Sequence, residues 1–273
     1  AEKGEDAQRS QEPQQPSRQS ELAQKEIAES GVKPREDLVL KKDPLKQSLW
    51  WAVRYVLKIP TNVLLIIASA LGYYFFAGVR AFAMIYVTGH YGLSRSVASG
   101  LVIVIGLGGI AGALAGGRLA DRLLRRGWLS ARVLVPGVGL LLTVIFIAPA
   151  VWTTNVPIAV VLLTLGSGML GAVNPPLDSA RLDIMHPRLW GRAESVRITL
   201  RMFLEAAAPT VFGLISERVF GGGTGGLKWT FLLMLLPVLV ASSLSIPARR
   251  SYPRDVATAS ASLNAGPEGK HRQ

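Results

Sequence analysis

The feature that most constrains this chain is a set of apolar runs long enough to cross a lipid bilayer. The hydrocarbon layer is about 30 Å thick and an α-helix rises about 1.5 Å per residue, so a spanning helix needs about 20 mostly apolar residues. Between Val133 and Leu177 there is no charged residue, which leaves room for two spans joined at the polar cluster from Thr153 to Pro157. The pattern therefore predicts an all-α membrane protein.

Five segments reach this length, and a sixth is needed to join the fourth span to the last. This additional segment is the fifth along the chain, and its uncharged core is too short to cross the bilayer alone. We still expect it to cross, because a re-entrant hairpin there would reverse the charge bias of the loops. The predicted spans are 60–88, 97–117, 133–151, 157–177, 195–220 and 229–248.

The segments outside the spans differ in composition. Residues 1–43 have no aromatic residue and are rich in Gln, Glu, Lys, Ser and Pro, so we expect a disordered cytoplasmic lead. Residues 44–58 place a basic or Trp side chain at every fourth position beside an apolar stripe, which predicts an amphipathic helix on the membrane surface. The tail, 251–273, is rich in Ala, Ser and Gly and is expected to be disordered and cytoplasmic. Because the chain begins with Ala1, we expect it to be a fragment or a split product.

Basic residues in short loops predict the orientation, since Lys and Arg favour the cytoplasmic side. The opposite loops hold only Arg95, Arg218 and Lys228. The loops after spans two and four carry Arg118, Arg122, Arg125, Arg126, Arg132, Arg181, Arg188 and Arg192. We therefore expect both termini to be cytoplasmic and the protein to lie in a plasma or inner membrane. The net charge of +12 is spread over these clusters rather than over one polar face, which argues against a nucleic-acid partner.

Residue types needed for several chemistries are absent or scattered. The sequence has no cysteine and only three widely spaced histidines, so we expect no metal site and no cofactor. A six-span intramembrane serine protease would use a serine in span four, where Gly166, Ser167 and Gly168 occur. That pattern needs a glycine in place of Leu165 and a histidine in span six, which has none. We predict that the protein is not an enzyme.

The loop after span two carries a motif. Its residues are Gly117, Arg118, Leu119, Ala120, Asp121, Arg122, Leu123, Leu124, Arg125 and Arg126. This resembles the signature cytoplasmic loop of the major facilitator superfamily, which follows the second helix of each six-helix half, although Leu124 stands where a glycine is usual. The resemblance covers residues 44–250 and implies the C-terminal half of a transporter, with 1–43 as the central linker. The asparagine and prolines that end span four, and the aromatic span one, look similar to actinobacterial drug-efflux and spinster-like members.

The resemblance implies secondary active transport of a small molecule by alternating access, as a symporter or antiporter, coupled to an ion such as the proton. It also implies a partner, the N-terminal six-helix half, on the same polypeptide or on a separate chain. The alternative is a six-span scaffold or assembly protein without transport activity. Within the bilayer such a protein would have no use for charged residues, and charges there cost about 2.5 to 3.5 kcal/mol each.

A charged stripe in span five provides candidate gating residues, because Glu194, Arg197, Arg201 and Glu205 share one helix face. The stripe can pair internally, Glu194 with Arg197 and Arg201 with Glu205, and reach the cytoplasmic surface. Alternatively it forms an inner gate, because related transporters link the loop after span two to the start of span five with charge pairs. The candidate gating set is Asp121, Arg122, Arg125, Glu194, Arg197 and Arg201.

A second set is predicted to line the substrate or proton pathway. Glu205 is the deepest carboxylate of the stripe, and Arg80 is a lone arginine inside span one, which marks a site by default. Tyr73 and Tyr74 lie near the middle of the same span, and Asn174 precedes two prolines that break span four. In span two, the four-residue spacing of Gly108, Gly112 and Gly116 predicts close helix packing.

Overall fold

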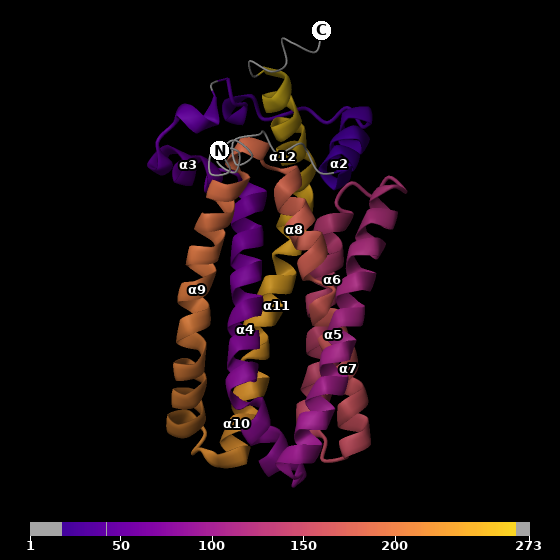
Figure 1. The fold of residues 1–273 in the computed structure, drawn as a ribbon, viewed down its shortest axis with the longest axis vertical. Helices are drawn as coiled ribbons and strands as arrows, with labels where there is room; N and C mark the ends of the chain where they lie inside the picture. Colours follow the sequence, from indigo (N-terminus) through magenta and orange to yellow (C-terminus); the bar gives the residue numbers. More distant parts are fainter. Residues whose placement is uncertain (1–17, 42, 266–273) are drawn as a thin grey trace, which may run out of the picture.

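The computed structural model describes residues 18–41 and 43–265, and in these ranges it contains six helices long and apolar enough to cross a membrane. The first three are α4 (Pro60–Tyr91), α5 (Arg95–Leu124) and α6 (Ala131–Trp152). The fourth joins α7 (Val156–Gly171) to α8 (Asn174–Asp183), and the fifth joins α9 (Trp190–Leu214) to the π-helical turn η4 (Ile215–Val219). The sixth consists of α10 (Gly223–Leu233), α11 (Leu235–Ser243) and α12 (Ser245–Ala265). The predicted all-α bundle of six spans is confirmed (Figure 1).

Prolines explain why two of the spans are segmented. In the fourth span the helix breaks at Ala172 and Val173, and Pro175 and Pro176 lie in the first turn of α8, where a missing N–H does no harm. The predicted break is present, but the helix resumes at Asn174 instead of stopping there. In the last span the interruptions at Met234 and Leu244 lie just before Pro237 and Pro247, which remove hydrogen bonds to the preceding turn.

Small residues line the most extensive helix contact, which is between α5 and α7. A Cβ atom added to Gly112 would lie 1.8 Å from the carbonyl oxygen of Gly168, and one added to Gly171 would lie 2.1 Å from that of Gly109. The glycine spacing in span two therefore does produce close helix packing. We call this contact between α5 and α7, two helices of the same bundle, the seam. The other extensive contacts pair α4 with α9 and place α6 between α7 and α11.

The flanking segments are more ordered than composition predicted. The expected disordered tail is wrong up to Ala265, because α12 continues past Ser251 and buries Tyr252, Val256 and Ala259. The expected disordered lead is also wrong where it is described. Residues 18–41 contain α2 (Arg18–Glu29) and the turn η1 (Glu36–Leu38), with Ala23 and Ile27 buried. In both segments small or isolated apolar side chains pack against each other, which average composition does not reveal. The rest of the lead, 1–17, lies outside the described residues.

The predicted surface helix is shorter than expected. It consists of the turn η2 (Pro44–Lys46) and the helix α3 (Leu49–Val56), which begins where the Ser48 hydroxyl accepts a hydrogen bond from the Trp51 amide at 3.2 Å. Figure 1 places α3 at one end of the bundle, beside the first turns of α9. We call this end the α3 end.

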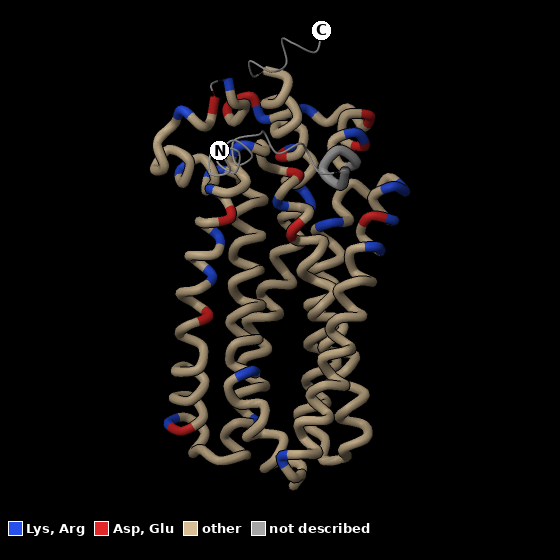
Figure 2. Tube along the Cα trace, viewed as in Figure 1, with Lys and Arg blue, Asp and Glu red and all other residues tan. Residues whose placement is uncertain are grey.

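Charged residues gather at the α3 end, and far fewer lie at the opposite end (Figure 2). A charged stripe also descends along α9 toward the middle of the bundle (Figure 2).

The end of the bundle opposite α3 is held together by aromatic side chains of α4. The Tyr86 hydroxyl donates to the Val151 carbonyl at 2.6 Å, and the Tyr91 hydroxyl donates to the Ala150 carbonyl at 2.7 Å. The charge distribution agrees with the positive-inside pattern, and the cytoplasmic location of the α3 end stays a prediction.

Candidate functional site

A groove of about 490 Å³ lies between α4 and α9. The two helices approach closely beside it, because Gly78 has no side chain and the Phe212 ring occupies the space that a Cβ atom would fill, at 2.3 Å. The side chains along the groove are small, charged or flexible, which keeps it open. They belong to Ala77, Arg80, Ala81, Arg201, Met202, Glu205, Ala206 and Pro209.

Three charged groups line this groove. Arg201 and Glu205 form an ion pair with 3.6 Å between Nε and Oε2, and the Arg201 guanidinium lies 4.0 Å from the centre of the Tyr73 ring. Arg80 is exposed and makes no ion pair with any described residue. The groove thus carries one positive charge more than its carboxylate balances. It can bind a polar or charged group inside an otherwise apolar layer.

The predicted pathway residues are only partly brought together. Arg80 and Glu205 line the groove, and Tyr73 joins it through its contact with Arg201. Tyr74 instead packs between the helices, with its ring centre 5.9 Å from that of Phe212. Asn174 is the first residue of α8 and is not among the lining residues.

A second cluster lies near the α3 end and is centred on Arg132, whose side chain is fully buried. Its guanidinium donates to Asp121 at 2.8 Å and to both oxygens of Asp183 at 2.7 and 2.8 Å. The Tyr252 hydroxyl donates to Asp183 at 2.5 Å. These four residues, which we call the Arg132 cluster, connect α5, α6, α8 and α12. Such charge-assisted hydrogen bonds offset the cost of burying the charges.

Sequence reasoning identified Asp121 but missed the other three members of this cluster. Arg132 was counted only as a charge that orients a loop. Arg132 lies 11 residues from Asp121 and 51 from Asp183, and Tyr252 lies 69 residues from Asp183. Only the packing of the spans brings these residues together. An arginine directly before an apolar span is the one local signal, because an arginine that becomes buried there requires an acidic partner.

A third cluster joins α8 to α9. Arg181 bridges Asp178 and Glu194, with 3.3 Å between its Nη1 and the Glu194 carboxylate, and Glu194 also pairs with Arg197. The two internal pairs considered for the stripe, Glu194 with Arg197 and Arg201 with Glu205, are both present.

The gating set predicted from sequence therefore does not form one cluster. Asp121 pairs with Arg132 instead of the start of span five, because Arg132 lies buried beside it whereas α9 packs along α4. Arg122 and Arg125 are exposed, and neither makes an ion pair with a described residue. The expected link between the loop after span two and span five is absent from the part of the chain that the structure describes.

Residues 35–40, which precede span one, are held against the end of α12, and we call this segment the strap. Asp255 is buried, accepts a hydrogen bond from the Thr61 amide at 3.0 Å and pairs with Arg35 at 3.3 Å. The Arg35 amide donates to Thr258 at 2.8 Å, and the Leu40 amide donates to Ser262 at 3.0 Å.

Tyr55 of α3 holds the same segment from the other side. Its hydroxyl donates to the Leu38 carbonyl at 2.9 Å. Burial raises the pKa of Tyr55 to about 12, so this hydroxyl keeps its proton at neutral pH.

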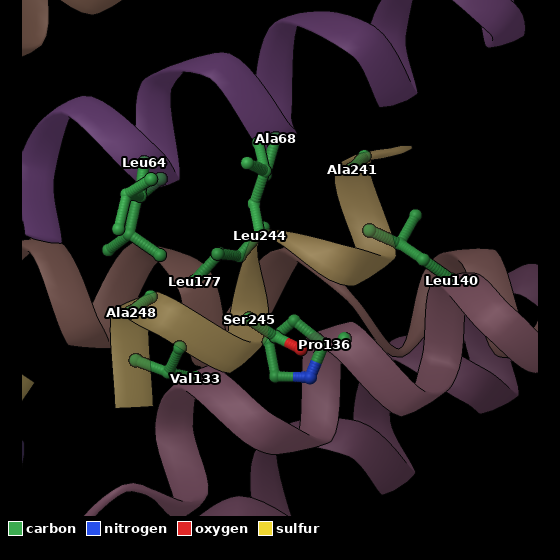
Figure 3. Close-up of a pocket in the computed structure, with 12 residues that line it drawn as sticks. Leu64, Ala68, Val133, Pro136, Leu140, Leu177, Ala241, Leu244, Ser245 and Ala248 are labelled. Carbon is green, nitrogen blue, oxygen red and sulfur yellow. The ribbon is translucent and has the colours of Figure 1, made fainter. Parts of the chain in front are cut away.

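Two other kinds of site find no support. The cavity in Figure 3 lies among Leu64, Val133, Pro136, Leu244 and neighbouring apolar side chains, and its volume of about 10 Å³ has space for one water molecule at most. It is a small gap in the core between α4, α6 and α12. No group of three metal-ligating side chains occurs among the described residues.

Comparisons with known proteins agree with this architecture. The family profile described as Major Facilitator Superfamily matches residues 7–209. Two crystal structures of a bacterial homologue of the human lysosomal transporter Spinster, both inward-facing, are similar in fold. The occupied form has a TM-score of 0.59 and 19% sequence identity, and the match covers 72% of this chain and 50% of that chain. The unoccupied form has a TM-score of 0.60 and 18% sequence identity, and the match covers 78% of this chain and 52% of that chain. This chain thus spans about half the length of these structures, and at such identity the likeness concerns the fold alone. No curated protein matches the sequence.

Proposed function

Because this chain belongs to the Major Facilitator Superfamily, we propose that it forms one six-helix half of a secondary active transporter that moves a small molecule by alternating access. A second six-helix half, on the same polypeptide or on another chain, completes the substrate cavity. The family points to a transporter rather than an enzyme. Coupling to a proton gradient, and the location of the α3 end in the cytoplasm, are parts of this proposal.

The observation that carries the proposal is the charged groove between α4 and α9. Charges that face hydrocarbon are costly, so Arg80, Arg201 and Glu205 must face water or another protein surface. The groove is open to one side, and the substrate would bind there between the two halves. Glu205 is the candidate proton site, since it is the one carboxylate among the described lining residues.

Low burial of two spans leaves apolar surface that lipid or a second half must cover. In the apolar windows of α5 and of the fifth span only 11% of the residues are buried, compared with 50% in α4. These two spans therefore leave most of their surface free within this chain. A second bundle would cover the sides of α5 and α9 that no described residue contacts.

The two ionic clusters near the α3 end are candidates for the inner gate. The Arg132 cluster fixes the ends of four helices. The third cluster, in which Arg181 bridges Asp178 and Glu194, fixes α8 to α9. In this proposal they keep the α3 end of this half rigid while it rocks against the other half.

One observation favours the alternative, a scaffold or assembly protein without a transport cycle. Four charged residues of α9 pair within the helix, as a purely structural stripe would. Arg80 argues against it, because a scaffold has no need for an exposed arginine inside a span without an ion-pair partner among the described residues.

Reconstitution tests the proposal. Proteoliposomes that contain both halves, loaded with a pH-sensitive dye, should show saturable proton movement when organic anions or cations are added from a panel. Proteoliposomes with this chain alone should show none, because one half supplies only one wall of the cavity. Absence of any response with both halves present would favour the scaffold. Robust transport by this chain alone would show that two copies suffice.

A further inference from the structure

The exposed side of η2 and α3 combines apolar and basic side chains. Trp50 is 78% exposed, Leu49 63% and Leu45 55%. Lys46, Arg54 and Lys58 are exposed along the same segment. We call these six residues the α3 surface. Large apolar groups of a protein in water are rarely exposed together, so this surface requires a partner.

The opposite side of α3 is firmly packed, which fixes the α3 surface in place. Ala52 and Val56 are fully buried, and the Tyr55 hydroxyl donates to the Leu38 carbonyl at 2.9 Å. The helix α3 ends at Val56 and α4 begins at Pro60, so α3 lies where the first span leaves the membrane. Figure 1 shows it at the end of the bundle, next to α9.

The acidic residue that immediately precedes η2 in the sequence is already neutralised. Asp43 pairs with Arg188 at 2.9 Å. Arg192 of α9 donates to the carbonyl oxygens of Pro44 and Gln47 at 3.1 and 3.0 Å, which ties η2 to the start of α9. The α3 segment itself contains no acidic side chain, so its exposed side presents only positive charge.

From these observations we propose that the α3 surface binds the anionic headgroups of the surrounding lipid bilayer. A tryptophan and two leucines would enter the boundary between headgroups and acyl chains, and the three basic side chains would contact the phosphates above them. Each basic group near an anionic leaflet contributes about fivefold in surface affinity. Through Arg188 and Arg192, lipid binding at α3 holds the first turn of α9. This inference does not depend on transport.

Hydrogen exchange in nanodiscs tests it. The chain is placed in nanodiscs of phosphatidylcholine alone or with about one third phosphatidylglycerol, which supplies the anionic surface. We expect amide exchange in residues 45–58 to be at least about fivefold slower with phosphatidylglycerol. The triple variant Lys46→Gln, Arg54→Gln, Lys58→Gln should lose this difference. The matched control Lys25→Gln, Lys33→Gln, Lys41→Gln removes three exposed basic residues elsewhere at the same end and should keep it.

Folding of the variants is checked by the exchange of α12, which should be unchanged. If the triple variant fails to fold, high salt in the unaltered chain replaces it, because a Debye length of about 3 Å at 1 M salt screens these contacts and should erase the lipid dependence. Equal protection in both lipids, or a lipid dependence that survives in the triple variant, would overturn the proposal. Protection that appears only when the second transporter half is present would assign the α3 surface to a protein interface instead.

Discussion

Arg132 and Asp183 form an ion pair with 2.7 Å between Nη1 and Oδ2, and neither side chain has any exposed surface. The pair joins the first turn of α6 to the last turn of α8, at the α3 end of the bundle. Asp121 extends it to α5 and Tyr252 extends it to α12. Four spans are thus connected at one end through a single guanidinium.

Replacing Arg132 should destabilise the bundle strongly. Arg132→Met leaves two carboxylates near each other without a cation, and breaking a buried pair in this way costs about 3 to 5 kcal/mol. Thermal unfolding of the detergent-solubilised protein, followed by loss of monodispersity, measures the effect. Arg122→Met on the same end of the bundle is the control, because Arg122 is exposed. Equal melting temperatures for the two variants would show that the Arg132 cluster contributes nothing to stability.

The seam between α5 and α7 should tolerate no side chain at Gly112. Gly112→Val would place a Cβ atom 1.8 Å from the Gly168 carbonyl oxygen, so the two helices must separate. Gly106→Val on the same helix meets nothing within 4 Å and should remain folded. Expression and size-exclusion profiles compare the two variants. A normal profile for Gly112→Val would mean that α5 and α7 are not packed as described.

Spacing along the chain predicted the features that arise within one helix. The spans follow from apolar length, and the pairs Glu194–Arg197 and Arg201–Glu205 follow from separations of three and four residues, which place both partners on one face. The breaks in the last span were not predicted, although Pro237 and Pro247 are local signals for them. The glycine spacing indicated a close seam but could not identify α7 as the partner.

Features that depend on packing between distant segments were missed or misjudged. The Arg132 cluster joins residues from four helices, so no local pattern reveals it. The extension of α12 was expected to be disordered because Ala and Ser dominate its sequence, yet these small side chains allow the strap to pack closely. For the same reason, the described residues show Asp121 paired with Arg132 and no link between the loop after span two and span five. A carboxylate pairs with the nearest cation, and packing decides which cation that is.

Shortening α12 should release the strap. Deletion of residues 256–273 removes Thr258 and Ser262, which accept the amides of Arg35 and Leu40. Trypsin cleavage after Arg35 should then be several-fold faster, since local opening governs proteolysis. Deletion of 266–273 leaves both acceptors in place and should not change the rate. Equal cleavage of the two truncated chains would show that α12 does not hold the strap in place.

Glu205→Gln should uncouple transport from the proton gradient in the complete transporter. The substitution keeps the shape of the groove and removes its one described carboxylate, which lies 3.6 Å from Arg201 and in the same groove as Arg80. Uptake should lose its dependence on a pH gradient while exchange of substrate across the membrane persists. Glu217→Gln, at the exposed end of the same span, should behave as the unaltered protein. An unchanged pH response in Glu205→Gln would leave Glu205 with a structural role only.

A labelling experiment can test, without knowledge of the substrate, whether the groove between α4 and α9 is part of an alternating-access pathway. This chain has no cysteine, so an introduced thiol is the only one that it contributes, and any cysteine of the second half is replaced before labelling. Ala206→Cys places it in the groove, and Ile145→Cys places it on the exposed outer side of α6. A membrane-impermeant maleimide is then applied to the complete transporter from each side of the membrane in turn. Ala206→Cys should be labelled from both sides and Ile145→Cys from neither, whereas an Ala206→Cys thiol as unreactive as that of Ile145→Cys would contradict alternating access at this groove.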